Sequence, residues 1–203
     1  MENGEMFIEE NTLIAIADYV LGRTPGNTVS NLSSSRGLRD VTEKHNSTYH
    51  AAAVGEVNVV TRMKEVDAVI GGEGNGGVIY PALHYGRDAL VGVALFLTLM
   101  ARSGKSVSGI KASLPAYAIA KNKIQLTPDI DVDAILEAVK EKYSGEKITD
   151  IDGVKIDFPT SWVHLRKSNT EPIIRIYSEA PTMKEAEELA ESIKSVINEI
   201  KTC

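Results

Sequence analysis

The sequence predicts an α/β fold in two parts. Residues 1–114 are expected to form a three-layer α/β domain with a mostly parallel sheet, and residues 115–203 a small α+β domain with an antiparallel sheet and a C-terminal helix. Helical and β-type stretches alternate through the first part, as in parallel sheets, whereas β-type runs follow one another in the second. Residues 103–125 contain glycines and a proline without clear periodicity, so we place the boundary near Leu114.

The elements of the first domain follow from hydrophobic spacing. A first helix is expected to begin at Asn11 or Thr12 and to end at Gly22, before Pro25. Residues 88–102 are apolar almost all round, so we expect a central, deeply buried helix there. The other expected elements are strands at residues 28–32, 48–53 and 68–70 and helices through Leu38 and Val41 and over residues 56–65.

The second domain is expected to contain two amphipathic helices and three strands. Residues 131–143 carry apolar side chains at helical spacing, and Asp131 favours the N-terminal end of that helix. The last helix begins near Pro181, with an apolar stripe long enough to cover one face of a small sheet. The expected strands lie at residues 154–158, 162–165 and 173–177.

The composition excludes several classes of function. The chain is 43% hydrophobic and 25% charged, as in a globular protein, and no apolar run reaches the ~18 residues of a membrane span. The formal charge of −6 argues against nucleic-acid binding, so any phosphate must be bound at a local site. Cys203 is the only cysteine, which excludes an internal disulfide and a cysteine-rich zinc site and fits a reducing, cytoplasmic setting.

The N-terminus lacks the basic and apolar regions of a secretory signal. Asn3 and Gly4 form a tight-turn signature between two short extended runs, a pattern that indicates a start within a folded unit. We therefore expect the chain to be part of a longer protein.

A polar loop is expected at residues 166–172, between two β-type runs. It reads Arg-Lys-Ser-Asn-Thr-Glu-Pro, and Arg175 follows soon after it. Hydroxyl, amide and backbone N–H groups donate to anions, and guanidinium groups add charge and bidentate geometry, so the loop suits a phosphate monoester. The alternative is an ordinary turn between antiparallel strands with solvated arginines.

A glycine-dense loop at residues 71–77 follows the third strand of the first domain. Ligands bind outside the carboxyl ends of strands in open α/β sheets, where glycine lets the backbone come close to them. Glu73 and Asn75 are the side chains left for recognition, and a carboxylate with an amide is suited to reading sugar hydroxyls. The alternative is a long flexible turn before the next helix.

A weaker set of polar residues lies at other strand ends. If the strands are parallel neighbours, Arg36, Glu56 and Glu73 converge on one rim, although each taken alone is typical of a helix cap or a first-turn charge. The four histidines show no metal-ligand spacing, so we expect no metal site in the chain. His84 and Arg87 lie soon after the glycine loop and either line the same cleft or serve packing.

The two loops together resemble the α-D-phosphohexomutase superfamily over nearly the whole chain. In that family four domains surround one cleft, and the third carries a Gly-Glu-x-(Ser/Asn)-Gly loop that binds the sugar. The fourth carries an Arg-x-Ser-(Asn/Gly)-Thr-x-Pro loop that binds phosphate. Residues 72–77 and 166–172 match these loops in the same order.

The resemblance implies a role for each matching residue. Glu73 and Asn75 would hold sugar hydroxyls, and Glu56 falls at a third-domain position that also faces the cleft. The family often has histidine at that position and at the last place of the sugar loop, where this chain has Glu56 and Gly77. The phosphate that is not transferred would be held by Arg166, Ser168, Asn169, Thr170 and Arg175.

The resemblance also implies the chemistry of the parent protein, an isomerase that interconverts hexose 1-phosphate and 6-phosphate, with glucose, mannose or glucosamine as the sugar. A phosphoserine donates its phosphoryl group to give a hexose bisphosphate, which is both intermediate and activator, and Mg²⁺ stabilises the transfer. This chain has neither the serine loop nor the metal loop. Its implied partners are therefore a hexose phosphate and the N-terminal domains of the same polypeptide, and the chain alone is expected to be inactive.

Two other hypotheses remain open from the sequence. One is a stand-alone, non-catalytic module that binds sugar phosphates and never had the other domains. The other is an interaction domain in which both polar loops are incidental, and a failure to bind any hexose phosphate would favour it.

Overall fold

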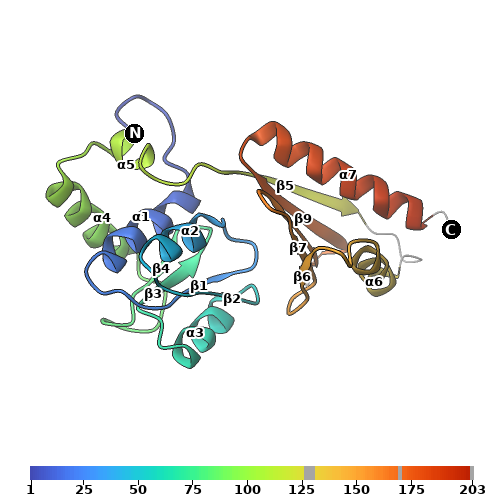
Figure 1. Cartoon of the computed structure of the whole chain (residues 1–203), viewed down its shortest axis with the longest axis horizontal. Coiled ribbons are helices and arrows are strands. Elements are labelled where there is room, and N and C mark those ends of the chain that lie inside the picture. Colours follow the sequence, from blue (N-terminus) through green and yellow to red (C-terminus); the bar gives the residue numbers. More distant parts are fainter. Residues whose placement is uncertain (126–130, 169–170, 202–203) are drawn as a thin grey trace. The chain divides into compact units, whose positions relative to one another are not determined.

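The computed structural model divides the chain into two compact units, Met1–Ala116 and Tyr117–Cys203 (Figure 1). It describes residues 1–125, 131–168 and 171–201. No helix within these ranges is both long enough and apolar enough to cross a bilayer.

The first unit is built on a four-stranded sheet. Its strands are β1 (Thr28–Asn31), β2 (Tyr49–Ala52), β3 (Ile70–Glu73) and β4 (Gly77–Ile79). They lie in the order β2-β1-β3-β4, with β1 parallel to both neighbours and β4 returning antiparallel beside β3. The prediction of a mostly parallel sheet is confirmed.

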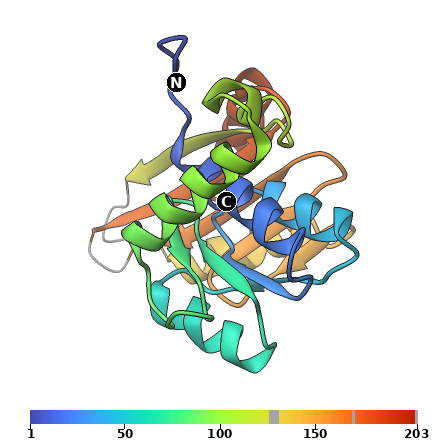
Figure 2. The same ribbon diagram turned by 90° about the vertical axis from the view of Figure 1, so that its left-hand side faces the viewer.

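Helices cover both faces of this sheet and form the predicted three layers (Figures 1 and 2). They are α1 (Glu9–Leu21), α2 (Gly37–Lys44), α3 (Glu56–Glu65), α4 (Ala89–Ser103) and α5 (Val107–Lys111). On one face α1 and α2 pack against Ile70 and Val78. On the other, α3 packs against Val29 and Ala52. The carboxyl ends of β1 and β3 are therefore held between two apolar layers.

The prediction of a deeply buried helix at residues 88–102 is wrong about its burial. α4 forms there, but Gly92 is its one buried residue, and Leu90, Val93 and Leu97 are 81%, 55% and 57% exposed. The helix packs along one side, against α1 and β4. Its other side is equally apolar, because the sequence is apolar all round, but it faces no other element among the described residues of this unit.

The second unit is an antiparallel sheet with two helices. Its elements are β5 (Ala118–Gln125), α6 (Val132–Lys142), β6 (Lys147–Thr149), β7 (Val154–Asp157), β8 (Trp162–Lys167), β9 (Ile173–Ala180) and α7 (Met183–Lys201). The strand order is β5-β9-β8-β7-β6. Three of the five strands are those the sequence predicts. The edge strands β5 and β6 were missed, because β5 mixes polar with apolar residues in a stretch that resembled a linker and β6 is short.

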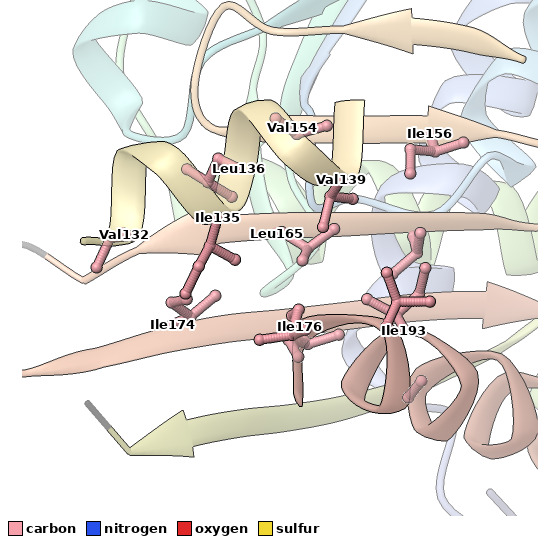
Figure 3. Close-up of a cluster of buried hydrophobic side chains, with 14 residues drawn as sticks. Val132, Ile135, Leu136, Val139, Val154, Ile156, Leu165, Ile174, Ile176 and Ile193 are labelled. Atoms are coloured by element: carbon pink, nitrogen blue, oxygen red, sulfur yellow. The ribbon is translucent and has the colours of Figure 1, made fainter. Parts of the chain in front are cut away.

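The two helices of the second unit cover a single face of its sheet. Ile135, Leu136 and Val139 of α6 point toward Leu165 and Ile174 of the central strands (Figure 3). Side chains alternate across a strand, so the neighbouring positions of β8 and β9 project from the opposite face. The face away from the helices carries polar side chains together with the buried Trp162 and Ile173.

The burial of α4 can be tested by one pair of leucine substitutions. We expect Leu13→Ala, at 2% exposure on α1, to lower the free energy of unfolding of the first unit by about 2–5 kcal/mol. Leu97→Ala, at 57% exposure on α4, should change it by no more than about 0.5 kcal/mol. Denaturant unfolding of the purified chain measures both. An equal loss for the two variants would contradict the exposed position of α4.

Candidate functional site

The glycine loop begins beside the end of β1, where the parallel register places Ser30 opposite Gly72. Asn31 is therefore next to Glu73, and its Nδ2 donates to Glu73 Oε1 at 2.9 Å. Both residues are buried, Asn31 at 6% and Glu73 at 5% exposure. A buried carboxylate needs hydrogen-bond donors to offset its lost hydration, and Asn31 provides one from the neighbouring strand.

A serine from the segment after β1 extends this network to the loop backbone. Ser34 Oγ donates to Asn31 Oδ1 at 2.9 Å and accepts the Gly74 N–H at 2.9 Å. Ser34 is 3% exposed. The loop after Glu73 is therefore fastened to the end of β1 at two points, which does not fit the alternative of a long flexible turn.

The glycines let the loop pack closely against its own chain. A Cβ at Gly72 would collide with the carbonyl oxygen of Gly77 across the β3–β4 hairpin, and one at Gly74 would collide with the Glu10 carboxylate. Glu10 also accepts the Ser35 N–H at 3.0 Å. From the sequence we expected these glycines to let the backbone approach a ligand. In the structure the close partners of these two glycines are other parts of the protein.

Arg87 joins the two acidic residues singled out in the first domain. Its Nε lies 2.9 Å from Glu56 Oε2 and its backbone N–H donates to Glu56 Oε1 at 2.9 Å. Its Nη1 lies 3.2 Å from Glu73 Oε2. The backbone and side-chain hydrogen bonds from Arg87 hold the pKa of Glu56 below its usual range. Of Arg36, Glu56 and Glu73, which were expected to converge, Glu56 and Glu73 are joined through Arg87.

The remaining candidates of this domain lie around the same loop. Asn75 is exposed, and its Oδ1 accepts the Gly77 N–H at 3.0 Å. Arg36 is buried at the start of α2. His84 Nε2 lies 3.0 Å from Asp88 Oδ2, and Asp88 caps α4 through Leu90 N–H at 2.8 Å. Ser34 belongs to the polar segment 33–36 that the sequence places after a strand, whereas Asn31 was missed, and its signal was its place at the carboxyl end of a buried strand.

The polar loop of the second unit connects β8 to β9. Arg166 Nε lies 2.9 Å from Asp152 Oδ2, and Arg175 Nη2 lies 3.3 Å from Glu171 Oε2. Ser168 is 8% exposed, and its N–H donates to the Ile173 carbonyl at 3.0 Å, which closes the base of the loop. The other two predicted phosphate ligands, Asn169 and Thr170, lie outside the described residues.

Three cations lie side by side across this sheet. Arg166 of β8 is paired with Arg175 of β9, which is paired with Lys123 of β5. Directly opposed residues share a face, and like charges in these positions repel unless an anion or a carboxylate compensates them. Asp152 and Glu171 compensate in part, so the row is suited to accepting an anion. The sequence analysis missed Lys123, because it did not identify β5 as a strand.

His164 is the buried histidine of this unit. It is 1% exposed, and its Nε2 lies 2.7 Å from the Asp152 carbonyl oxygen, so the neutral ring donates the hydrogen bond. The pKa of His164 is lowered to about 4, chiefly by burial and also by the nearby charges of Lys155 and Arg166, while Asp152 acts in the opposite direction. His164 therefore keeps the segment before β7 in place next to Arg166.

The described residues do not supply a metal site. No group of three or more histidine, cysteine, aspartate or glutamate side chains among them is placed to hold a metal ion. The acidic residues of the first-unit site are already engaged with Arg87 and Asn31.

The fold defines a class of protein, one with an α/β/α domain followed by a small domain built on an antiparallel sheet. The family model for phosphoglucomutase/phosphomannomutase, alpha/beta/alpha domain III, matches residues 9–117. The model for the phosphoglucomutase/phosphomannomutase C-terminal domain matches residues 120–196. The chain belongs to the phosphoglucomutase/phosphomannomutase family.

Relatives with curated names agree with this membership. A phosphoglucomutase/phosphomannomutase of Thermococcus kodakarensis is 36% identical over 191 residues, which are 94% of this chain and 42% of the relative. A phosphoglucosamine/phosphogalactosamine mutase of Sulfurisphaera tokodaii is 36% identical over 171 residues, 83% of this chain and 38% of the relative. The chain thus spans less than half the length of these relatives.

Solved structures share the fold over almost the whole chain. A phosphoglucomutase/phosphomannomutase family protein of Burkholderia thailandensis matches with a TM-score of 0.81 at 20% identity, covering 99% of this chain and 43% of the other. N-acetylphosphoglucosamine mutase of Aspergillus fumigatus, solved with GlcNAc-6P and magnesium, matches with a TM-score of 0.69 at 13% identity, covering 95% and 44%. The fold predicted from the sequence is that of these family members.

The buried histidine predicts a pH dependence of stability. In the unfolded chain His164 takes up a proton near pH 6.5, whereas in the folded chain it does so only near pH 4. Its contribution to the free energy of unfolding is therefore complete above pH 6.5 and is lost as the pH falls toward about 4, by on the order of 3 kcal/mol.

His164→Gln tests this contribution, because an amide can donate to the Asp152 carbonyl but does not titrate in this range. Thermal unfolding of the second unit between pH 7 and pH 4 should show a shallower loss of stability in the variant. An identical pH dependence in both proteins would contradict the role given to His164.

Proposed function

We propose that this chain is the sugar- and phosphate-recognition part of a phosphohexomutase that interconverts hexose 1-phosphates and 6-phosphates. The observation that carries the proposal is the state of Glu73, a buried carboxylate in the family's sugar-loop position, held by Asn31 on one oxygen and Arg87 on the other. Each oxygen retains a lone pair, so Glu73 is preorganised to accept hydrogen bonds from sugar hydroxyls.

The other proposed sugar contacts complement this carboxylate. Asn75 is exposed and uses its Oδ1 within the loop, so its NH₂ group can donate to a hydroxyl oxygen. Glu56 is a third member of the sugar site, at the start of α3. Carboxylate and amide together read a sugar by accepting from some hydroxyls and donating to others. Glucose, mannose and glucosamine phosphates are the candidate substrates.

The phosphate contacts are proposed in the second unit. Arg166, Arg175 and Lys123 form the row of cations, and Ser168 lies at the base of the loop that follows Arg166. Asn169 and Thr170 of the same loop complete the proposed set. Such a site would hold the phosphate that is not being transferred, so that the other end of the hexose is free to react.

The phosphoryl carrier is proposed to lie outside this chain, in N-terminal domains of the same polypeptide. Neither the serine loop nor the metal loop occurs in the sequence, and relatives are more than twice as long as their matched region. Mg²⁺ would likewise be bound there, and a hexose bisphosphate would serve as intermediate and activator. The single cysteine is consistent with the cytoplasm as the setting.

A direct test compares this chain with the longest polypeptide that its gene encodes. Phosphomutase activity would be measured with glucose 1-phosphate, mannose 1-phosphate and glucosamine 6-phosphate, with Mg²⁺ and the hexose bisphosphate present throughout. Activity confined to the longer protein is expected and would identify the substrate. Binding without activity in both would favour a stand-alone sugar-phosphate module, and activity of this chain alone would contradict the placement of the catalytic groups.

Glu73→Gln should lower kcat/KM of the active polypeptide by about 10- to 100-fold, because it removes the charged acceptor of hydroxyl hydrogen bonds. The matched control is Glu65→Gln, which removes a carboxylate that pairs with Arg62 at the far end of α3. An unchanged kcat/KM in Glu73→Gln would remove the main support for the sugar site.

A further inference from the structure

Arg87 lies outside the glycine loop at residues 71–77, yet it contacts Glu73 in the proposed sugar site. It lies beyond the β3–β4 hairpin, next to Asp88, the residue that caps α4, and forms a β-bridge with Ile79. Its backbone is thereby fixed to the sheet, while 43% of its side chain is exposed. The sheet therefore holds the backbone of Arg87, and its guanidinium group contacts the carboxylates of both Glu56 and Glu73.

The contacts of Arg87 differ between its two acidic partners. Glu56 receives two hydrogen bonds from it, one from the backbone N–H and one from Nε, so both Glu56 oxygens are engaged with the same residue. Glu73 receives only Nη1, at 3.2 Å, and Asn31 supplies its other donor. Glu56 thus holds Arg87 at its backbone N–H and at Nε, and Nη1 of the same guanidinium group holds Glu73.

The carboxylates of Glu56 and Glu73 also differ in how far they are exposed to solvent. The Glu56 side chain is 34% exposed, so water can solvate it, whereas the Glu73 side chain is 7% exposed. A carboxylate with little hydration depends strongly on the charge and direction of its donors. The carboxylate that relies most on Arg87 is therefore the one proposed to read the sugar.

We propose that Glu56 and Arg87 are positioning residues that act as a unit, in which Glu56 fixes the guanidinium group of Arg87 and Arg87 orients Glu73 toward the sugar. This inference rests on the proposed function and refines it, because Glu56 then acts through Arg87 rather than by direct contact with the substrate. Arg87 also compensates one of two neighbouring negative charges, which makes the site less repulsive to a phosphorylated sugar.

The experiment is a double-mutant cycle in the longest polypeptide that the gene encodes, with Glu56→Gln, Arg87→Met and the two combined. If the residues act as a unit, each single variant raises KM for the hexose phosphate by about 10-fold or more, and the double variant is no worse than the poorer single one. Inhibition by inorganic phosphate should stay unchanged, because the anion site is made by other residues. Arg87→Lys should restore little, since one ammonium group cannot bridge both carboxylates in this geometry.

The matched control is another Arg–Glu ion pair, in which both residues, Arg62 and Glu65, belong to α3. Their side chains are 40% and 54% exposed. Arg62→Met and Glu65→Gln should leave KM within about twofold, as expected for an exposed pair away from the site. Multiplicative effects in the Glu56–Arg87 cycle, or full activity of Arg87→Lys, would overturn the inference while leaving the proposed function intact. Absence of mutase activity from the unaltered polypeptide would overturn the proposed function and this inference together.

Discussion

Much of the first unit depends on how the Glu73 carboxylate is accommodated at the end of a buried strand. A charge in that position is unfavourable unless donors surround it, and two reach it from distant parts of the sequence: Asn31 at the end of β1 and Arg87 beyond the hairpin. Glu56 in turn accepts hydrogen bonds from Arg87. Ser34 then attaches the loop backbone to the same network. One buried charge therefore links the strand ends, the glycine loop and the start of α3.

The second unit meets a different constraint, which is to present cations on a sheet without disrupting it. Its two helices cover one face, and the strand residues directed there are Val154, Ile156, Val163, Leu165, Ile174 and Ile176. The opposite positions of the central strands are then available to Arg166 and Arg175, with Lys123 beside them on β5. Partial compensation by Asp152 and Glu171 limits the repulsion within the row.

The sequence predicted the layers and both loops because these features are local. Period-3.6 and buried-strand patterns identified the main helices and the inner strands, and the loop motifs named Glu73, Glu56, Arg166 and Arg175 directly. What it could not supply was long-range pairing. Asn31 became visible only once β1 was known to lie beside β3, and Lys123 only once β5 was paired with β9. The apolar sequence of α4 indicated burial, but one-sided packing on α1 and β4 is a tertiary property that composition does not contain.

The exposed side of α4 also affects how the isolated chain behaves in solution. Leu90, Val93 and Leu97 follow one another at helical spacing and form a continuous apolar strip on a rigid helix. Water in contact with such a strip is released when two of them meet, so colloidal stability falls as protein concentration rises. The net charge of −6 opposes this attraction by mutual repulsion and does so less effectively at high ionic strength. Low salt and dilute protein are consequently the conditions that favour a monodisperse preparation.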